Sequence, residues 1–203
     1  MYNLILVLCA LWCITTHSQE AAALPKRLPH VLIVMGSVRQ GRTAEQIARA
    51  IVNSADANTI DLEIVDLKEI NLPVISGHES VEDNTHVIQW SKKVTTADGV
   101  IFLTPNYNEG YSGVIKNAID ALSHEWQDKV VGVVAYTGGY DGGKKPADYL
   151  LAVLQTLHMK PLLDSIVLIP FADGAVNDLN MFKKQRNQDA VTSLLTTIVK
   201  VVS

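Results

Sequence analysis

Residues 30–43 read HVLIVMGSVRQGRT and carry the clearest signal of the fold in this chain. Its first part, residues 30–35, is an almost continuous apolar run that ends at Gly36. Such a run is typical of a strand buried on both faces, as in a parallel sheet. Beyond the loop, apolar side chains recur every three or four residues over positions 44–51, which is the spacing of one helical face. The stretch therefore predicts a strand, a tight loop and a helix.

The same alternation continues along the chain. Further strands are predicted at residues 59–67, 99–103, 130–136 and 165–169, and further helices around residues 87–94, 115–122, 150–157 and 191–198, with residues 68–77 as a loop. Strands that alternate with helices imply an α/β fold, with a mostly parallel sheet covered by helices on both faces. In such sheets ligands bind outside the carboxyl ends of the strands, near the point where the strand order reverses.

Composition narrows the class of protein. The chain has 203 residues with a formal net charge of −4, which fits one domain large enough to form a full core. The mild acidity argues against nucleic acid as the main partner, because phosphate backbones attract basic surfaces. Both cysteines, Cys9 and Cys13, lie near the amino terminus, so the rest of the chain has no thiol for catalysis or a disulfide.

The first 18 residues form a separate segment. They carry no Lys, Arg, Asp or Glu, and residues 4–14 are an apolar run too short to span a bilayer comfortably. We expect a signal peptide cleaved after Ser18, which places the mature protein in the secretory pathway or outside the cell with no membrane span. A buried or membrane-associated helix is the alternative. Residues 19–29 are predicted to be a linker, and residues 30–203 the domain.

The loop after the first strand has the residues of an anion site. Free backbone N–H groups at a helix start favour an anion, and glycines let the backbone turn tightly. Hydroxyl and guanidinium groups add donors that suit phosphate. These groups come from Ser37, Arg39, Arg42 and Thr43, with glycines at 36 and 41. An ordinary turn with two solvated arginines is the alternative interpretation.

A nucleotide triphosphate loop is a rival for this motif. That loop ends in Gly-Lys-Ser/Thr, whereas here Arg42 stands in place of the lysine. The rival also needs an Asp at the end of a neighbouring buried strand to organise magnesium. The strand at 99–103 ends in Thr104-Pro105 instead, and the three spaced glycines of a dinucleotide site are absent. The arginine in place of lysine and the missing Asp both count against an NTPase.

Two later loops suit a planar ring. Residues 104–113 (TPNYNEGYSG) offer the flat faces of Tyr107 and Tyr111 and two asparagine amides. Residues 137–143 (TGGYDGG) hold four glycines, which allow a close backbone approach. Each loop by itself also fits a rigid surface turn. Together with a phosphate loop they describe a mononucleotide site.

The three motifs GSVRQGR, TPNYNEGYSGVIKNAIDAL and TGGYDGG resemble, in order, those of the NADPH-dependent FMN reductase family of flavodoxin-like folds, over residues 31–170. The resemblance implies a three-layer sandwich with a five-stranded parallel sheet in the order 2-1-3-4-5. It implies bound FMN, reduced by NADPH or NADH, that passes electrons to a small acceptor such as a quinone, flavin, ferric complex or dye. It also implies a homodimer or homotetramer with the site across an interface.

The resemblance assigns roles to particular positions. The FMN phosphate would be bound by Ser37, Arg39, Gly41, Arg42 and Thr43, with Gln40 lining the loop. The isoalloxazine and ribityl chain would meet Pro105, Asn106, Tyr107 and Asn108, and the pyrimidine side would meet Gly138, Gly139 and Tyr140. The family often has Glu at the position of Asn106 and Tyr at that of Thr137, which puts redox tuning and acceptor preference in question. No catalytic acid or base is expected, because the flavin carries the chemistry.

Other interpretations stay open or are set aside. A redox-silent or one-electron FMN-binding protein is the main alternative, and an NTPase comes after it. A polar cluster with helical spacing, His78, Glu79, Glu82, Asp83 and His86, is interpreted as a solvated face and not as a metal site. Lys116 and Asp120 are expected to form a surface pair on one helix.

Overall fold

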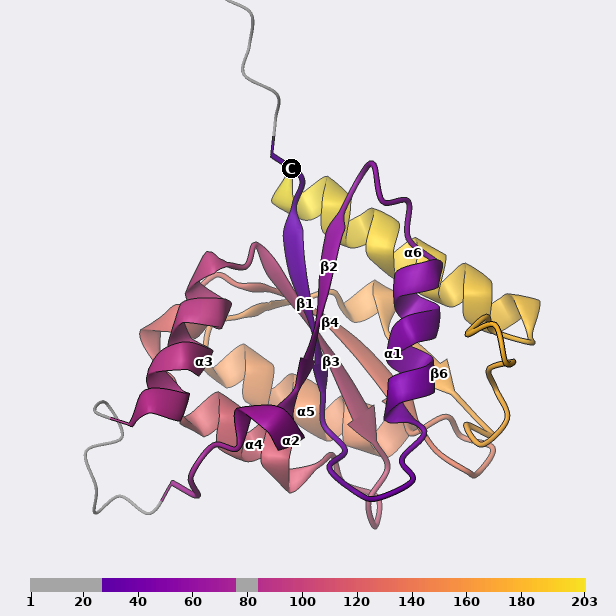
Figure 1. Cartoon of the computed structure of the whole chain (residues 1–203), viewed down its shortest axis with the longest axis horizontal. Helices are drawn as coiled ribbons and strands as arrows, with labels where there is room; N and C mark the ends of the chain where they lie inside the picture. Colours follow the sequence, from indigo (N-terminus) through magenta and orange to yellow (C-terminus); the bar gives the residue numbers. More distant parts are fainter. Residues whose placement is uncertain (1–26, 76–83) are drawn as a thin grey trace, which may run out of the picture.

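The computed structural model describes residues 27–75 and 84–203 (Figure 1). The predicted signal peptide, and the predicted linker as far as residue 26, lie outside the described residues. The strands are β1 His30–Met35, β2 Asp61–Asp66, β3 Gly99–Pro105, β4 Val130–Tyr136, β5 Lys160–Pro161 and β6 Val167–Ile169. The helices are α1 Ala44–Asn53, α2 Leu67–Ile70, α3 Thr85–Thr96, α4 Gly113–Asp120, α5 Lys144–Thr156 and α6 Gln185–Val202, with 3-10 turns at His124–Trp126 and Leu163–Ser165.

The sheet is parallel throughout and runs in the order β2-β1-β3-β4-β5, with β6 also paired to β4. The predicted α/β fold and strand order are confirmed. The order reverses between β1 and β3, where Val34 pairs with Phe102. The predicted strand at 165–169 is shorter than expected, because the fifth place in the sheet is divided between β5 and β6.

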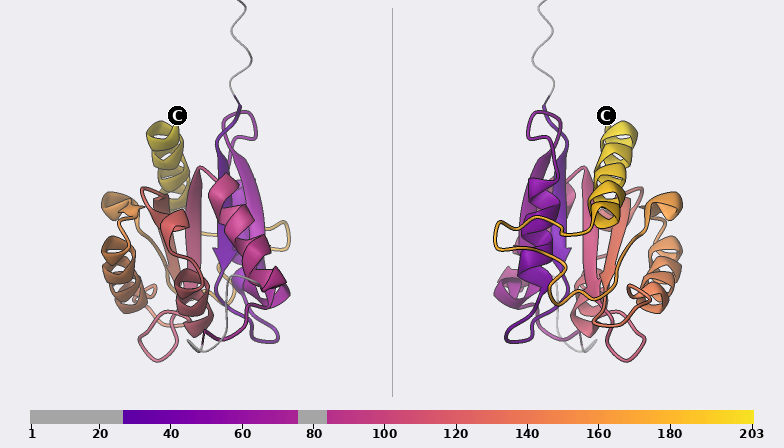
Figure 2. Two further views of the ribbon diagram at one scale, coloured as in Figure 1. Left: turned by 90° about the vertical axis from the view of Figure 1, so that its left-hand side faces the viewer. Right: turned by 90° about the vertical axis from the view of Figure 1, so that its right-hand side faces the viewer.

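Helices cover both faces of the sheet and make three layers (Figure 2). One apolar cluster joins alternate strand residues to α1 and α6. The other joins the remaining strand residues to α3, α4 and α5. Successive side chains of a strand point to opposite faces, so a strand covered on both faces must be apolar at nearly every position. β3 and β4 are buried along their whole length for this reason.

Two stretches differ from the predicted elements. The predicted loop at 68–77 overlaps the one-turn helix α2, because the Asp66 carboxylate accepts a hydrogen bond from the backbone N–H of Lys68 at 2.9 Å and caps it. Residues 27–29 of the predicted linker are fixed to the domain. Arg27 pairs with Asp98 at 2.8 Å, and the Pro29 carbonyl accepts from the N–H of Asp61 at 2.9 Å. Within the described ranges, none of the helices has the length and apolar character needed to cross a membrane.

Candidate functional site

The loops that follow β1 and β3 are joined directly at the carboxyl edge of the sheet. The Gly36 N–H donates to the Leu103 carbonyl at 2.9 Å, and the Ser112 hydroxyl donates to the Gly36 carbonyl. A Cβ on Gly36 would lie 2.3 Å from Cδ1 of Ile115, so a side chain cannot fit at this position unless the Ile115 side chain moves. The glycine therefore allows the first loop to lie directly against the second.

A cavity of about 260 Å³ opens where these loops meet. It is lined by Ser37, Arg39, Gln40, Gly41, Arg42, Thr43, Pro105, Asn106, Tyr107 and Gly138, all predicted site residues, and by Tyr136, Thr137, Ala172 and Asp173. The loops after β1, β3, β4 and β6 thus contribute to one site, as expected at the switch point of an open parallel sheet. Three predicted residues, Asn108, Gly139 and Tyr140, do not line this cavity.

Five hydroxyl-bearing side chains and two arginines line the cavity. The hydroxyls of Ser37 and Tyr107 are hydrogen-bonded to each other at 2.7 Å. The guanidinium of Arg39 lies over the Tyr107 ring, 5.8 Å from its centroid. Gly41 has a φ of +67°, which turns the chain into the start of α1. Hydroxyl donors beside a cation and a helix start suit a phosphate monoester.

Arg42 lies differently from the cation expected for a phosphate ligand. Its guanidinium pairs with the carboxylates of Asp66 and Glu45, and also donates to the Ser37 carbonyl at 2.5 Å. The hydrogen bond to Asp66 raises the pKa of Arg42, although burial acts in the opposite direction. Only 6% of the Arg42 side chain is exposed. Its contact with phosphate stays a prediction, and in this arrangement Arg42 holds the loop in shape.

The structure adds Tyr136 to the residues of the candidate site. From the sequence, Tyr136 was predicted only to be the last residue of the strand at 130–136. It is 6% exposed, and its hydroxyl has no hydrogen-bond partner among the described residues. Burial raises the pKa of Tyr136, and the nearby Ser37 hydroxyl opposes this only in part, so the group is a neutral O–H donor at neutral pH. A buried donor without a partner costs free energy unless a ligand or water accepts from it.

Asp173 and Ala172 were also missed. They follow β6 at the carboxyl edge of the sheet, just beyond residue 170, where the resemblance to the family ends. The Thr43 hydroxyl donates to Asp173 at 2.7 Å. The segment is fixed by hydrogen bonds from the N–H of Ala172 to the Thr137 carbonyl and from the N–H of Phe171 to the Gly139 carbonyl.

The second loop turns back on itself beside the cavity. Tyr107 and Gly110 exchange two backbone hydrogen bonds of 2.9 Å. Asn108 and Glu109, between them, have positive φ angles, as a tight two-residue turn requires. The Asn106 side-chain carbonyl accepts from the N–H of Glu109 at 2.8 Å, so this oxygen stabilises the turn. Asn108 is thereby placed at the exposed tip.

The third loop is open to solvent. Tyr140 is 86% exposed, and Gly138 and Gly139 are exposed beside it. The positive φ angles of this loop fall on Gly142 and Gly143, of which the second precedes α5. Glycine is needed at 142 because a Cβ there would lie 2.7 Å from that of Leu168.

The other features singled out in the sequence lie elsewhere. Lys116 and Asp120 form the expected surface pair on α4. Of the polar cluster, residues 78, 79, 82 and 83 lie outside the described residues, and the His86 ring is hydrogen-bonded to the Ile70 carbonyl at 2.9 Å. Within the two described stretches, no group of three His, Cys, Asp or Glu residues could hold a metal ion.

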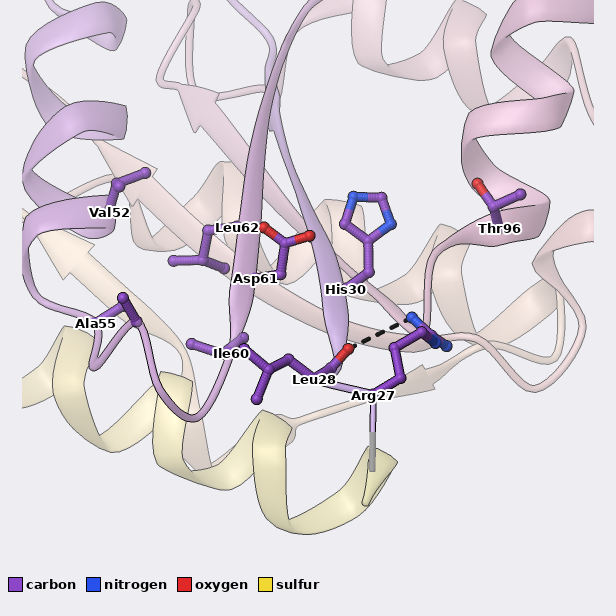
Figure 3. Close-up of a pocket in the computed structure, with 10 residues that line it drawn as sticks. Arg27, Leu28, His30, Val52, Ala55, Ile60, Asp61, Leu62 and Thr96 are labelled. Carbon is purple, nitrogen blue, oxygen red and sulfur yellow. Dashed lines mark hydrogen bonds between the residues drawn. The ribbon is translucent and has the colours of Figure 1, made fainter. Parts of the chain in front are cut away.

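A larger cavity, of about 880 Å³, lies at the amino ends of β1 and β2, away from the predicted loops (Figure 3). Its walls are mostly apolar, with Ile60 and Leu62 near the start of β2 and Leu28 before β1. It is formed at the amino ends of the strands, and the loops that carry the predicted motifs do not reach it. We therefore take the smaller polar cavity as the candidate site.

Comparison with known proteins places the chain in a family. A sequence model of the NADPH-dependent FMN reductase family matches residues 29–174. The NAD(P)H-dependent FMN reductase of Saccharomyces cerevisiae is 38% identical over 154 residues, covering 68% of this chain and 80% of the yeast protein. An FMN-dependent NADPH-azoreductase of Staphylococcus haemolyticus is 31% identical over 131 residues, covering 62% of this chain and 69% of that enzyme.

Solved structures support the same fold. A flavoenzyme NAD(P)H:(acceptor) oxidoreductase from Paracoccus denitrificans superposes with a TM-score of 0.76 at 19% identity, covering 86% of this chain and 97% of that one. The family match, the yeast relative and the flavodoxin-like sheet agree with one another. The chain belongs to the NADPH-dependent FMN reductase family and is an FMN-dependent NAD(P)H oxidoreductase.

Proposed function

We propose that the polar cavity holds the phosphate and ribityl chain of FMN, and that the chain transfers hydride from NADPH or NADH through this flavin to a small acceptor. The observation that carries the proposal is the unpartnered hydroxyl of Tyr136 in a cavity that also presents Ser37, Tyr107 and the Arg39 cation. A phosphate or ribityl oxygen there would accept from Tyr136, so the residues present fit the cofactor. FMN, when bound, supplies the hydride-accepting and electron-donating chemistry.

The protein's own residues orient the cofactor. Arg39 supplies the cation for the phosphate, because the charge of Arg42 is compensated by Asp66 and Glu45. Pro105 and Tyr107, at the end of β3 and just beyond it, line the same cavity as Gly138 of the third loop. Gly138 and Gly139 are exposed there and leave room for a planar ring next to the backbone.

The flavin ring half of the site is open in the single chain. The cavity is smaller than the roughly 300–1,000 Å³ typical of cofactor sites. Tyr140 and Phe171 beside it are 86% and 53% exposed. We propose that a second copy of the chain, in a homodimer or homotetramer, covers the ring. Light scattering after size-exclusion chromatography, with and without FMN, tests this. A monomer that retains FMN would contradict it.

The acceptor is proposed from the relatives. The named relatives include FMN reductases and azoreductases, so we propose a quinone, free flavin, ferric complex or azo dye as acceptor. We also propose that residues 1–18 direct the protein into the secretory pathway. Amino-terminal sequencing of the secreted protein tests the second point, and retention of Met1 on a cytosolic product would contradict it.

A spectrum and a titration test the cofactor site. Purified protein reconstituted with FMN is expected to be yellow and to bleach with NADPH under anaerobic conditions. Arg39→Ala is expected to weaken FMN binding by about 10- to 100-fold, the usual effect of losing a charge-assisted contact. Arg49→Ala, an exposed arginine on α1, is the matched control and should bind normally. Equal effects of the two variants would contradict the assignment.

The same experiments separate the alternatives. A redox-silent or one-electron FMN-binding protein would be yellow but would not bleach with NADPH. An NTPase would bind ATP with magnesium in competition with FMN. Against the second stands the arginine in place of the P-loop lysine, with its guanidinium held by Asp66.

A further inference from the structure

The hydroxyl of Thr43, which is predicted to donate to the FMN phosphate, is already hydrogen-bonded to the carboxylate of Asp173. The Thr43 hydroxyl, at the start of α1, donates to Oδ1 of Asp173 at 2.7 Å. Asp173 lines the same cavity as Ser37, Arg39 and the unpartnered Tyr136 hydroxyl. The start of a helix favours a negative charge, and here that charge is supplied by the chain itself.

The Thr43 hydroxyl cannot serve two anions at once. A hydroxyl has a single proton to donate, so the hydrogen bond to Asp173 excludes one to a phosphate oxygen. A phosphate within hydrogen-bond distance of the Thr43 hydroxyl would also lie close to the Asp173 carboxylate, which accepts from the same hydroxyl. The two negative charges would repel each other. Phosphate binding to Thr43 therefore requires the Asp173 side chain to leave it.

The surroundings allow the side chain to move but hold its backbone. The adjacent Ala172 is buried and its N–H donates to the Thr137 carbonyl at 2.8 Å. Gly174, on the other side, has a φ of +87°, which fixes the direction of the chain. Asp173 itself is exposed, so rotation about its side-chain bonds brings the carboxylate into solvent without moving the loop.

Among the side chains that line the cavity, only Arg39 and Arg42 are cations that could offset this carboxylate. Arg42 is balanced by Asp66 and Glu45, and Arg39 makes no ion pair within the described residues. Two arginines alone would favour binding of a phosphate dianion. The negative charge of Asp173 makes the cavity less favourable for that dianion. Asp173 thus acts against the phosphate, which is the part of FMN that distinguishes it from riboflavin.

Resting on the function proposed above, we propose that Asp173 is an intramolecular competitor of the FMN phosphate. It accepts the Thr43 hydrogen bond when no phosphate is bound, and it lowers the preference of the site for FMN over the unphosphorylated flavin. Asp173 is therefore a specificity-determining residue, because it contacts the Thr43 hydroxyl that would bind the phosphate. Removing the Asp173 carboxylate strengthens phosphate binding.

The test compares two flavins in apoprotein titrations followed by quenching of flavin fluorescence. Asp173→Asn removes the charge and keeps the shape, and Asp173→Ala also frees the Thr43 hydroxyl. Both are expected to bind FMN about tenfold more tightly, with riboflavin affinity unchanged within about twofold. Asp178→Asn removes an exposed carboxylate from the same β6–α6 connection and is expected to leave both affinities unchanged. Circular dichroism checks that each variant folds.

The outcomes are distinguishable. A rise in the ratio of FMN to riboflavin affinity in both Asp173 variants supports the inference. An unchanged or lower ratio overturns it while leaving the proposed function intact, and an equal rise in Asp178→Asn reduces the effect to overall charge and overturns it as well. A wild-type chain that binds neither flavin refutes the proposed function and this inference together.

Discussion

Replacing Arg42 by alanine tests whether this arginine stabilises the first loop or binds the FMN phosphate. The guanidinium lies between Asp66, Glu45 and the Ser37 carbonyl, and the side chains of Arg42 and Asp66 are 6% and 10% exposed. Removing one partner of a buried pair leaves a charge without compensation, which typically costs 3–5 kcal/mol. The N–H of Lys68 still donates to Asp66, so we expect a loss of about 2–4 kcal/mol in the free energy of unfolding of the apoprotein.

Urea denaturation and thermal melting of the apoprotein measure this loss. For a domain of this size the expected fall in Tm is roughly 5–15 °C, since each kcal/mol moves Tm by about 2–4 °C. Arg42→Lys keeps the charge but not the planar fork, so it is expected to lose less stability. Arg39→Ala is the matched control, because Arg39 is exposed and its loss should change apoprotein stability by no more than about 0.5 kcal/mol.

The two arginines are thus expected to show opposite profiles. Arg42→Ala lowers apoprotein stability, whereas Arg39→Ala lowers FMN affinity in a folded protein. The reasoning is refuted if Arg42→Ala keeps wild-type apoprotein stability and loses more FMN affinity than Arg39→Ala, since Arg42 would then act on the phosphate and not on the loop.

Three further substitutions test the site and the packing around it. Tyr136→Phe removes a buried hydroxyl that has no partner among residues 27–75 and 84–203, so apoprotein stability in urea should be unchanged or higher by about 1 kcal/mol, while FMN affinity falls roughly 3- to 30-fold; lower stability with unchanged affinity would contradict this. Gly36→Ala places a Cβ 2.3 Å from Cδ1 of Ile115 and is expected to cost about 1–3 kcal/mol of unfolding free energy; an unchanged urea midpoint would show that the Ile115 side chain moves aside without cost. Trp126→Phe removes the 2.9 Å hydrogen bond to the Ile119 carbonyl, which keeps the Leu122 N–H at 3.2 Å, and leaves a cavity in the core, so thermal melting should report a loss of about 2–3 kcal/mol; a loss below about 0.5 kcal/mol would contradict it.

Local sequence patterns predicted the fold for a physical reason. Strands buried on both faces must be apolar throughout, as 130–136 are, and helices on a sheet must repeat every three to four residues, as 44–51 do. Element ends were less predictable. α2 forms because Asp66 caps it, and the fifth place in the sheet is shared by two short strands, neither of which leaves a strong periodic signal.

The loops show where local patterns stop being informative. The motifs after β1, β3 and β4 were visible, because glycines, hydroxyls and arginines at a strand end predict an anion site. The sequence did not show which side chains of these loops are already paired with another residue of the chain. Arg42 and Arg39 look equivalent in the sequence, yet one is paired with Asp66, 24 residues away along the chain, and the other faces the cavity.

Residue patterns and the family motifs were enough to predict a parallel α/β sheet, its strand order and a phosphate-type loop at its carboxyl edge. Which groups at that edge are available to a ligand depends on the three-dimensional arrangement. Folding brings Asp173 to Thr43 across 130 positions and leaves the Tyr136 hydroxyl without a hydrogen-bond partner among the described residues. The reason is physical: hydrogen bonding and charge compensation depend on distances between residues far apart in the chain, and periodicity records only the side of an element that faces the core.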